Sequence, residues 1–162
     1  MTKPEFPDAR IFTVDTRFHK MARRKGGVPR AKAVRQAQAK VEEAKPQFDE
    51  WLDGALAEFA ALIETAQAGT AEADWIADAN SRSRQLRDSA ASLGFELIAF
   101  IAGSLCDILD AIEAGSECNM ESITCHFDAL MLACKTGYRH LKPEQVPELT
   151  KGLHRVVKHV AV

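Results

Sequence analysis

The segment 95-FELIAFIAGSLCDILDAIEA-114 is the longest nearly uninterrupted apolar stretch of this chain, and it decides the fold. Glu96 and Asp107 interrupt the apolar run, which makes it too short and too charged for a membrane span. We therefore predict a buried helix here and no transmembrane segment. Its large aliphatic residues recur at the three- and four-residue spacing of one helical face: Leu97, Ile98, Ile101, Leu105, Ile108, Leu109 and Ile112.

Segments on both sides of this helix show the same periodicity. One covers residues 48–66 and stops at Gly69, a second runs from about 70 to the terminator Gly94, and a third runs from the cap Asn119 to the stop Gly137. The last begins near Pro147, and its predicted buried face consists of Val146, Leu149, Leu153, Val156, Val157 and Val160. The connections are short and strand patterns are absent. We predict an all-α, antiparallel bundle of about five helices.

The N-terminal part of the chain has a different character. Prolines and the pair Gly26-Gly27 favour an extended arm over residues 1–27. Residues 31–45 predict a weakly amphipathic helix that packs lightly or pairs with another chain. Pro46 should end that helix and reset the chain. We therefore expect an arm and helix over 1–45 and a bundle domain over 46–162.

Charge separates the same two parts. Residues 1–45 contain twelve Lys and Arg against five Asp and Glu, whereas residues 46–162 contain nine against eighteen. The basic part could fold against an acidic bundle, of its own chain or of a sister chain, or bind an acidic partner. A homo-oligomer is therefore one possible outcome of this asymmetry.

Several classes of protein are disfavoured by the composition. The N-terminus is charged and lacks the apolar run of a secretory signal. The four cysteines lie within helical patterns, which favours a reduced, cytoplasmic setting. Cys118, Cys125, His126 and Cys134 do not have the spacing of metal ligands, and no phosphate-binding loop or hydrolase motif occurs. We expect no metal and no cofactor, and we favour a protein without enzymatic activity; histidine phosphotransfer is the activity to expect if there is one.

One window suggests a family. The segment 84-RQLRDSAASLG-94 resembles the helix of histidine-phosphotransfer (Hpt) domains that carries the phosphorylated histidine, a pattern of roughly His-x-Leu-Lys-Gly-Ser-Ala-x-x-Leu-Gly. Arg84 stands at the histidine position and Asp88 at the glycine, while Arg87 replaces a lysine. A guanidinium cannot pass on a phosphoryl group as a neutral imidazole can. The resemblance therefore implies an Hpt-like bundle without its usual phosphoacceptor, in which Arg84 and Arg87 contact a partner. The other reading is that small residues and Leu-Gly simply end a packed helix.

A second resemblance covers more of the chain. Four islands, within residues 21–27, 105–111, 126–130 and 152–157, are similar to the small CheE-type protein of bacterial chemotaxis operons. The resemblance implies a role in chemotaxis or two-component signalling, of the kind in which phosphorelays operate. It implies no particular biochemical activity.

His126 is the candidate for chemistry. It is expected on the flank of its helix, where the neighbours Ser122, Ala129 and Ala133 are all small. An imidazole that stands clear could receive a phosphoryl group from a receiver-domain aspartate, and the small neighbours would then contact that partner. Alternatively, this flank packs on a neighbouring helix and His126 is a hydrogen-bonded, partly buried residue.

The basic arm offers a third possibility. Lys20, Arg23, Arg24, Lys25 and Arg30 could follow a phosphate backbone, but only Phe18 accompanies them as an aromatic residue, so nucleic-acid binding is the less favoured interpretation. The working hypothesis is a non-enzymatic adaptor that binds a response-regulator receiver domain or a histidine-kinase component through an Hpt-like bundle. A true phosphotransfer protein using His126, and a basic-arm protein for assembly or nucleic-acid binding, are the alternatives.

Overall fold

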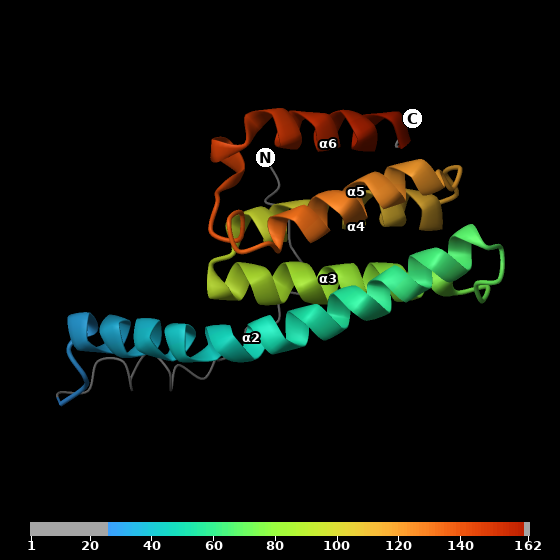
Figure 1. Cartoon of the computed structure of the whole chain (residues 1–162). Helices are drawn as coiled ribbons and strands as arrows, with labels where there is room; N and C mark the ends of the chain where they lie inside the picture. The colour runs from blue at the N-terminus through green and yellow to red at the C-terminus, as the bar shows by residue number, and fades with distance from the viewer. Residues whose placement is uncertain (1–25, 161–162) are drawn as a thin grey trace, which may run out of the picture. The chain divides into compact units, whose positions relative to one another are not determined.

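The computed structural model describes residues 26–160, and the regular secondary structure of this part of the chain is entirely helical (Figure 1). The α-helices are α2 (Arg30–Gln67), α3 (Trp75–Leu93), α4 (Glu96–Glu113), α5 (Met120–Ala133) and α6 (Pro147–Val160), and a short 3₁₀ helix, η1 (Pro143–Gln145), precedes α6. No strand occurs among the described residues. The predicted all-α fold with five helices is confirmed.

The chain divides into two units, residues 1–38 and 39–162, and the boundary falls inside α2. In the second unit, successive helices reverse direction (Figure 1); the turn between α3 and α4 is short, whereas residues 134–146, which include η1, connect α5 to α6. The division predicted at residue 45 stays a prediction. None of the helices between residues 26 and 160 is long and apolar enough to cross a membrane.

The predicted break at Pro46 is wrong, because α2 continues through it. A proline inside a helix removes one backbone hydrogen bond and costs about 3 kcal/mol. Pro46 and the preceding Glu42, whose carbonyl loses its donor, are both exposed, so water can solvate that carbonyl. Past the proline, Phe48 and Leu52 are buried and fix the helix to the core. The burial of Phe48 and Leu52 offsets the cost of the proline. The sequence pattern alone, in contrast, suggested that this cost would end the helix.

The core is built around α4. Leu97, Ile98, Ile101, Leu105 and Ile108 are all at most 1% exposed, which confirms the predicted buried helix. Aromatic pairs join α2 to the rest of this unit. Phe48 of α2 stacks on Phe95 with ring centroids 5.1 Å apart, and Phe59 of α2 stacks on Phe127 of α5 at 5.3 Å.

The helix ends explain where the chain turns. Gly94 has φ +82°, and the backbone N–H groups of Gly94 and Phe95 close the end of α3 on the carbonyls of Ala91 and Ala90, so the predicted terminator is confirmed. The side chain of Asn119 accepts a hydrogen bond from the Ser122 backbone at 3.2 Å, which confirms the predicted cap of α5.

The predicted boundaries differ by a few residues. The second helix of the bundle, α3, begins at Trp75 and not near residue 70, and α5 ends at Ala133, before Gly137. In α6 only Leu153 is fully buried, because this helix covers α4 and α5 from one side and leaves the rest of its apolar face partly exposed (Figure 1). Apolar side chains at the margin of that face are half-buried.

Candidate partner-binding face

The packing of α3 on α4 brings charged side chains from both helices to one surface, which we call the α3–α4 face: Arg84, Arg87, Asp88, Asp110 and Glu113. Arg84 is central to it. Its Nη2 donates to Asp110 Oδ1 at 2.5 Å, and its Nε donates to Asn80 Oδ1 at 3.2 Å. The Arg84 side chain is nevertheless 46% exposed. Asn80 and Asp110 therefore orient the guanidinium group of Arg84, and its exposed part remains accessible to a partner.

Asn80 orients the polar groups of this face, a role that sequence reasoning missed. The residue is only 4% exposed, and its amide Nδ2 donates to Asp110 Oδ1 at 2.6 Å and to Glu113 Oε2 at 2.8 Å. The hydrogen bond from Asn80 is the main cause that lowers the pKa of Asp110, and Arg84 lowers it further. The available signal was the four-residue spacing of Asn80 and Arg84, which places them on one side of α3.

Arg87 lies one turn further along α3. Its Nε donates to Asp88 Oδ1 at 2.8 Å, and this bond raises the pKa of Arg87 above its usual value. The aliphatic stem of Arg87 runs over Gly103 of α4, where an added Cβ would lie 3.5 Å from its Cδ. The Arg87 side chain is 36% exposed. The structure thus brings Arg84 and Arg87 to the same face, as a contact surface would require.

The nucleophiles near this face are not available for chemistry. The Ser83 hydroxyl is buried and donates to the Ala102 carbonyl at 3.0 Å. Cys106 is 1% exposed, and burial raises the pKa of its thiol, so the thiol is protonated at neutral pH. The exposed groups of the face are the guanidinium groups of Arg84 and Arg87, each next to a carboxylate. Such groups recognise charged partners by paired hydrogen bonds.

The expectation that His126 stands clear of the bundle is wrong. The residue is 0% exposed, because its flank of α5 packs on α4. Its Nδ1 lies 2.9 Å from the Ser122 carbonyl and its Nε2 lies 3.0 Å from Ser104 Oγ. A carbonyl only accepts, so Nδ1 must carry the proton and Nε2 accepts from the serine hydroxyl. Burial lowers the pKa of His126, which keeps the imidazole neutral.

The small neighbours of His126 explain its burial. Ser122, Ala129 and Ala133 are 8%, 7% and 1% exposed, so the expectation that they contact a partner is also wrong. Small side chains at this spacing let α5 approach α4 closely. The alternative interpretation, in which this flank packs on a neighbouring helix, is confirmed.

The basic arm lies mostly beyond what the structure covers. Lys20, Arg23, Arg24 and Lys25 lie outside the described residues. Arg30 is described, is exposed and begins α2. Between residues 26 and 160, no group of three or more His, Cys, Asp or Glu side chains has an arrangement that could hold a metal ion.

The cysteines fall into two pairs. Cys118 and Cys125 are exposed, whereas Cys106 and Cys134 are buried, and all four thiols are free. Burial raises the pKa of Cys134 to about 12. Burial also raises the pKa of Cys106 and Cys118, so these two thiols and Cys134 lack the lowered pKa of a reactive thiol.

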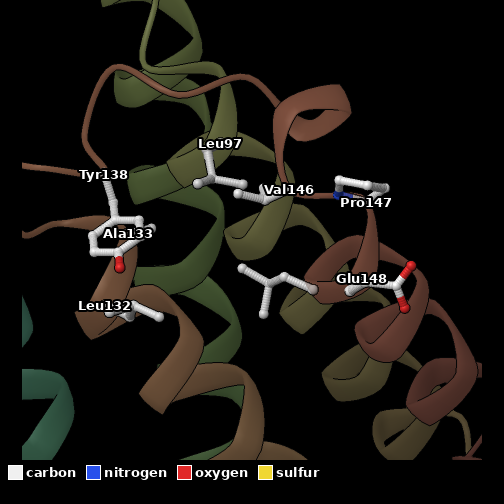
Figure 2. Close-up of a pocket in the computed structure, with 8 residues that line it drawn as sticks. Leu97, Leu132, Ala133, Tyr138, Val146, Pro147 and Glu148 are labelled. Atoms are coloured by element: carbon white, nitrogen blue, oxygen red, sulfur yellow. The ribbon is translucent and has the colours of Figure 1, made fainter.

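An apolar hollow of about 360 Å³ lies where α5 ends and α6 begins (Figure 2). Leu132 and Tyr138 lie on one side of it and Pro147 and Glu148 on the other, as Figure 2 shows, and Leu97 of α4 and Leu149 of α6 also line it. Arg139 fixes the loop that carries Tyr138, because its guanidinium donates to the Cys134 carbonyl at 2.9 and 3.1 Å and pairs with Asp49 at 2.6 Å. The hollow has the size of a small ligand site but almost no polar group to orient a ligand.

The function must therefore be argued from the geometry of the α3–α4 face. The Hpt-like window, residues 84–94, forms the second half of α3 and reaches its terminator Gly94. The resemblance itself stays an expectation. No protein-family model, curated protein or solved structure matches this chain.

Proposed function

We propose that this chain is a non-enzymatic adaptor of chemotaxis or two-component signalling, which binds a receiver domain or a histidine-kinase component through the α3–α4 face. The observation that carries the proposal is the state of Arg84. At the position where the Hpt-like pattern expects a histidine, this chain has an exposed guanidinium that Asn80 and Asp110 orient. Such a group binds a partner but cannot carry a phosphoryl group.

The burial of His126 supports an adaptor over a phosphotransfer protein. Phosphoryl transfer requires the acceptor nitrogen to meet the donor in line, within about 3 to 3.5 Å. Both ring nitrogens of His126 are engaged inside the bundle, and α5 would have to separate from α4 to release them. The adaptor needs no such opening.

Binding should be measured by calorimetry between the full chain and the receiver domains and kinase components encoded beside it. The pair Arg84→Ala and Arg87→Ala should weaken binding at least tenfold, because interface arginines often contribute 2 kcal/mol or more. Arg82→Ala is the matched control. Arg82 lies on the same helix, is similarly exposed and pairs with Glu58 of α2, away from the proposed face. Absence of binding to every candidate, or an equal loss with the control, would contradict the proposal.

Phosphoryl transfer needs a separate test. The chain should remain unlabelled when it is incubated with a receiver that carries labelled phosphate. An acid-labile label on the wild type that disappears in His126→Gln would show a phosphotransfer protein and would replace the adaptor proposal.

A further inference from the structure

The solvent side of α6 carries only basic charge beyond its first turn. Lys151, Arg155 and Lys158 are spaced by four and three residues, and all three are exposed. At about 100° per residue, this spacing places them on the side of α6 opposite to Leu153, which is 2% exposed and anchors the helix in the core. No acidic residue follows Glu148 in α6. We call Lys151, Arg155 and Lys158 the basic stripe.

Ion pairing separates the basic stripe from the other cations of the bundle. Between residues 46 and 150, every Lys and Arg except Lys135 pairs with a carboxylate: Arg82, Arg84, Arg87, Arg139 and Lys142. Arg155 and Lys158, in contrast, form no ion pair within residues 26–160, and Lys151 reaches Glu148 only at 3.5 Å, with both side chains largely exposed. The charge of the basic stripe is therefore available to a partner.

The helix dipole explains only one end of the basic stripe. Cations are favoured in the last turn of a helix, and Lys158 lies there, but Lys151 and Arg155 precede that turn. Arg155 Nε donates to the Lys151 carbonyl at 3.4 Å, which leaves the two terminal amino groups of its guanidinium for another acceptor. Such a pair of amino groups binds a carboxylate or a phosphate through two parallel hydrogen bonds. The central residue of the stripe is thus suited to an external anion.

The packing of α6 disfavours a lipid surface as the source of that anion. A helix that lies in a membrane interface inserts its apolar face into the lipid. Here α6 lies at one edge of the second unit, and it contacts α4 and α5 on one side (Figure 1). Its apolar side chains face that core, on the side opposite to the basic stripe. The stripe therefore has no apolar residue beside it to insert.

The length of the basic stripe disfavours a long polyanion. Its three cations span about 10 Å of helix, and Glu148 precedes Lys151 by three residues, so negative charge bounds the stripe at that end. Residues 46–162 contain eighteen Asp and Glu against nine Lys and Arg. A nucleic-acid duplex that extended past the stripe would therefore be repelled. A short acidic segment would not extend into this repulsion.

We propose that the basic stripe docks a short acidic helix of another protein, whose carboxylates are spaced by three and four residues like the cations of the stripe. Two helices with the same rise per residue bring such charges level with one another. Complementary charge at an exposed contact mainly selects the partner and speeds association, so the complex should be weak and should weaken further as salt is added. The proposal does not depend on the α3–α4 face or on its partner.

Amide NMR of the full chain tests the site. The probe is an alanine-based helical peptide with three Glu residues spaced by three and four, and its control is the same peptide with Gln in place of Glu. The acidic peptide should shift the amides of residues 150–159 most, and the Gln peptide should bind at least fivefold more weakly. Equal binding of both peptides would overturn the proposal. So would shifts centred on the basic start of α2, residues 30–40, or on the α3–α4 face.

Two sets of substitutions that remove the same charge compare the stripe with general attraction. Replacing Lys151, Arg155 and Lys158 together by Gln should weaken peptide binding about tenfold, because exposed ion pairs contribute modestly and three are lost. Replacing Arg30, Lys32 and Arg35 by Gln removes as many charges from the exposed start of α2 and should change the affinity less than twofold. An equal loss in both sets, or none in the first, would overturn the proposal.

Folding and the competing anions complete the test. All six substituted positions are exposed, so both variants should keep the melting transition of the wild type in circular dichroism. Arg84→Ala with Arg87→Ala should bind the acidic peptide like the wild type, so a failure of the α3–α4 face would leave this result unchanged. A duplex oligonucleotide, or vesicles of equal parts phosphatidylcholine and phosphatidylserine, that shifted the α6 amides at lower concentration than the acidic peptide would overturn the assignment to an acidic protein segment.

Discussion

The imidazole of His126 is neutral for a structural reason, and this has a consequence for stability. Burial lowers its pKa, while the Ser122 carbonyl and Asp107 partly oppose that effect. The folded state therefore binds fewer protons than the unfolded state between the lowered pKa and the usual value of about 6.5. The contribution is complete above about pH 6.5 and is lost as the pH falls through the folded-state pKa.

Urea unfolding of the wild type should accordingly show a lower midpoint at about pH 5.5 than at about pH 7.5. His126→Gln should cost about 1 to 3 kcal/mol at neutral pH, because Ser104 and Ser122 lose their partner, and should flatten this pH dependence. His154→Gln replaces an exposed histidine and should leave it unchanged. An equally steep dependence in His126→Gln would show that other groups cause it.

Asn80 is the second residue whose removal should matter. Asn80→Ala deprives Asp110 and Glu113 of a buried donor, so it should destabilise the fold by about 1 to 3 kcal/mol and return the pKa of Asp110 towards its usual value. Ser81→Ala, at the exposed neighbouring position, should change the free energy of unfolding by less than about 0.5 kcal/mol. Chemical denaturation and carboxyl NMR titration measure both effects. An unchanged Asp110 titration would show that the amide does not orient it.

At the scale of elements, α4 could be predicted and α2 could not, for physical reasons. The Leu and Ile residues of α4 are spaced so that they lie on one face of a helix. Burial of that face is the main contribution of α4 to the free energy of folding. For Pro46, a local cost competes with the burial of Phe48 and Leu52 further along, and only the fold shows which is larger. His126 was ambiguous because small neighbours suit both an exposed ring and a close helix contact. The Asn80 network joins helices about thirty residues apart, which no local pattern reveals.

Pro46→Ala should therefore stabilise the protein. Alanine restores the missing backbone hydrogen bond to Glu42 and removes the ring clash, so the melting temperature should rise, with a gain of up to about 3 kcal/mol. Gln47→Ala tests whether any exposed substitution beside the proline has the same effect. A variant that melts at or below the wild-type temperature would indicate that the kink at Pro46 is needed for packing.

For the whole molecule, the buried side chains set the minimal folding unit. The first core residue of α2 is Phe48, and the stretch before it contributes no fully buried side chain among the described residues. A chain that begins at Lys45 should therefore melt cooperatively, within a few degrees of the full chain at concentrations where both are monomeric. Circular dichroism decides this. A molten or insoluble truncated chain would show that the preceding residues are integral to the fold.

The reaction rates of the four free thiols report how often the helices that bury two of them separate. Reagents such as aromatic disulfides attack thiolates, so Cys118 and Cys125 should react soon after mixing, whereas Cys106 and Cys134 must wait until their helices separate. The absorbance of the released aromatic thiolate should then show two thiols that react fast and two that react slowly. The slow phases measure how often α4 and the end of α5 open, and that frequency sets how long Cys106 and Cys134 withstand oxidation.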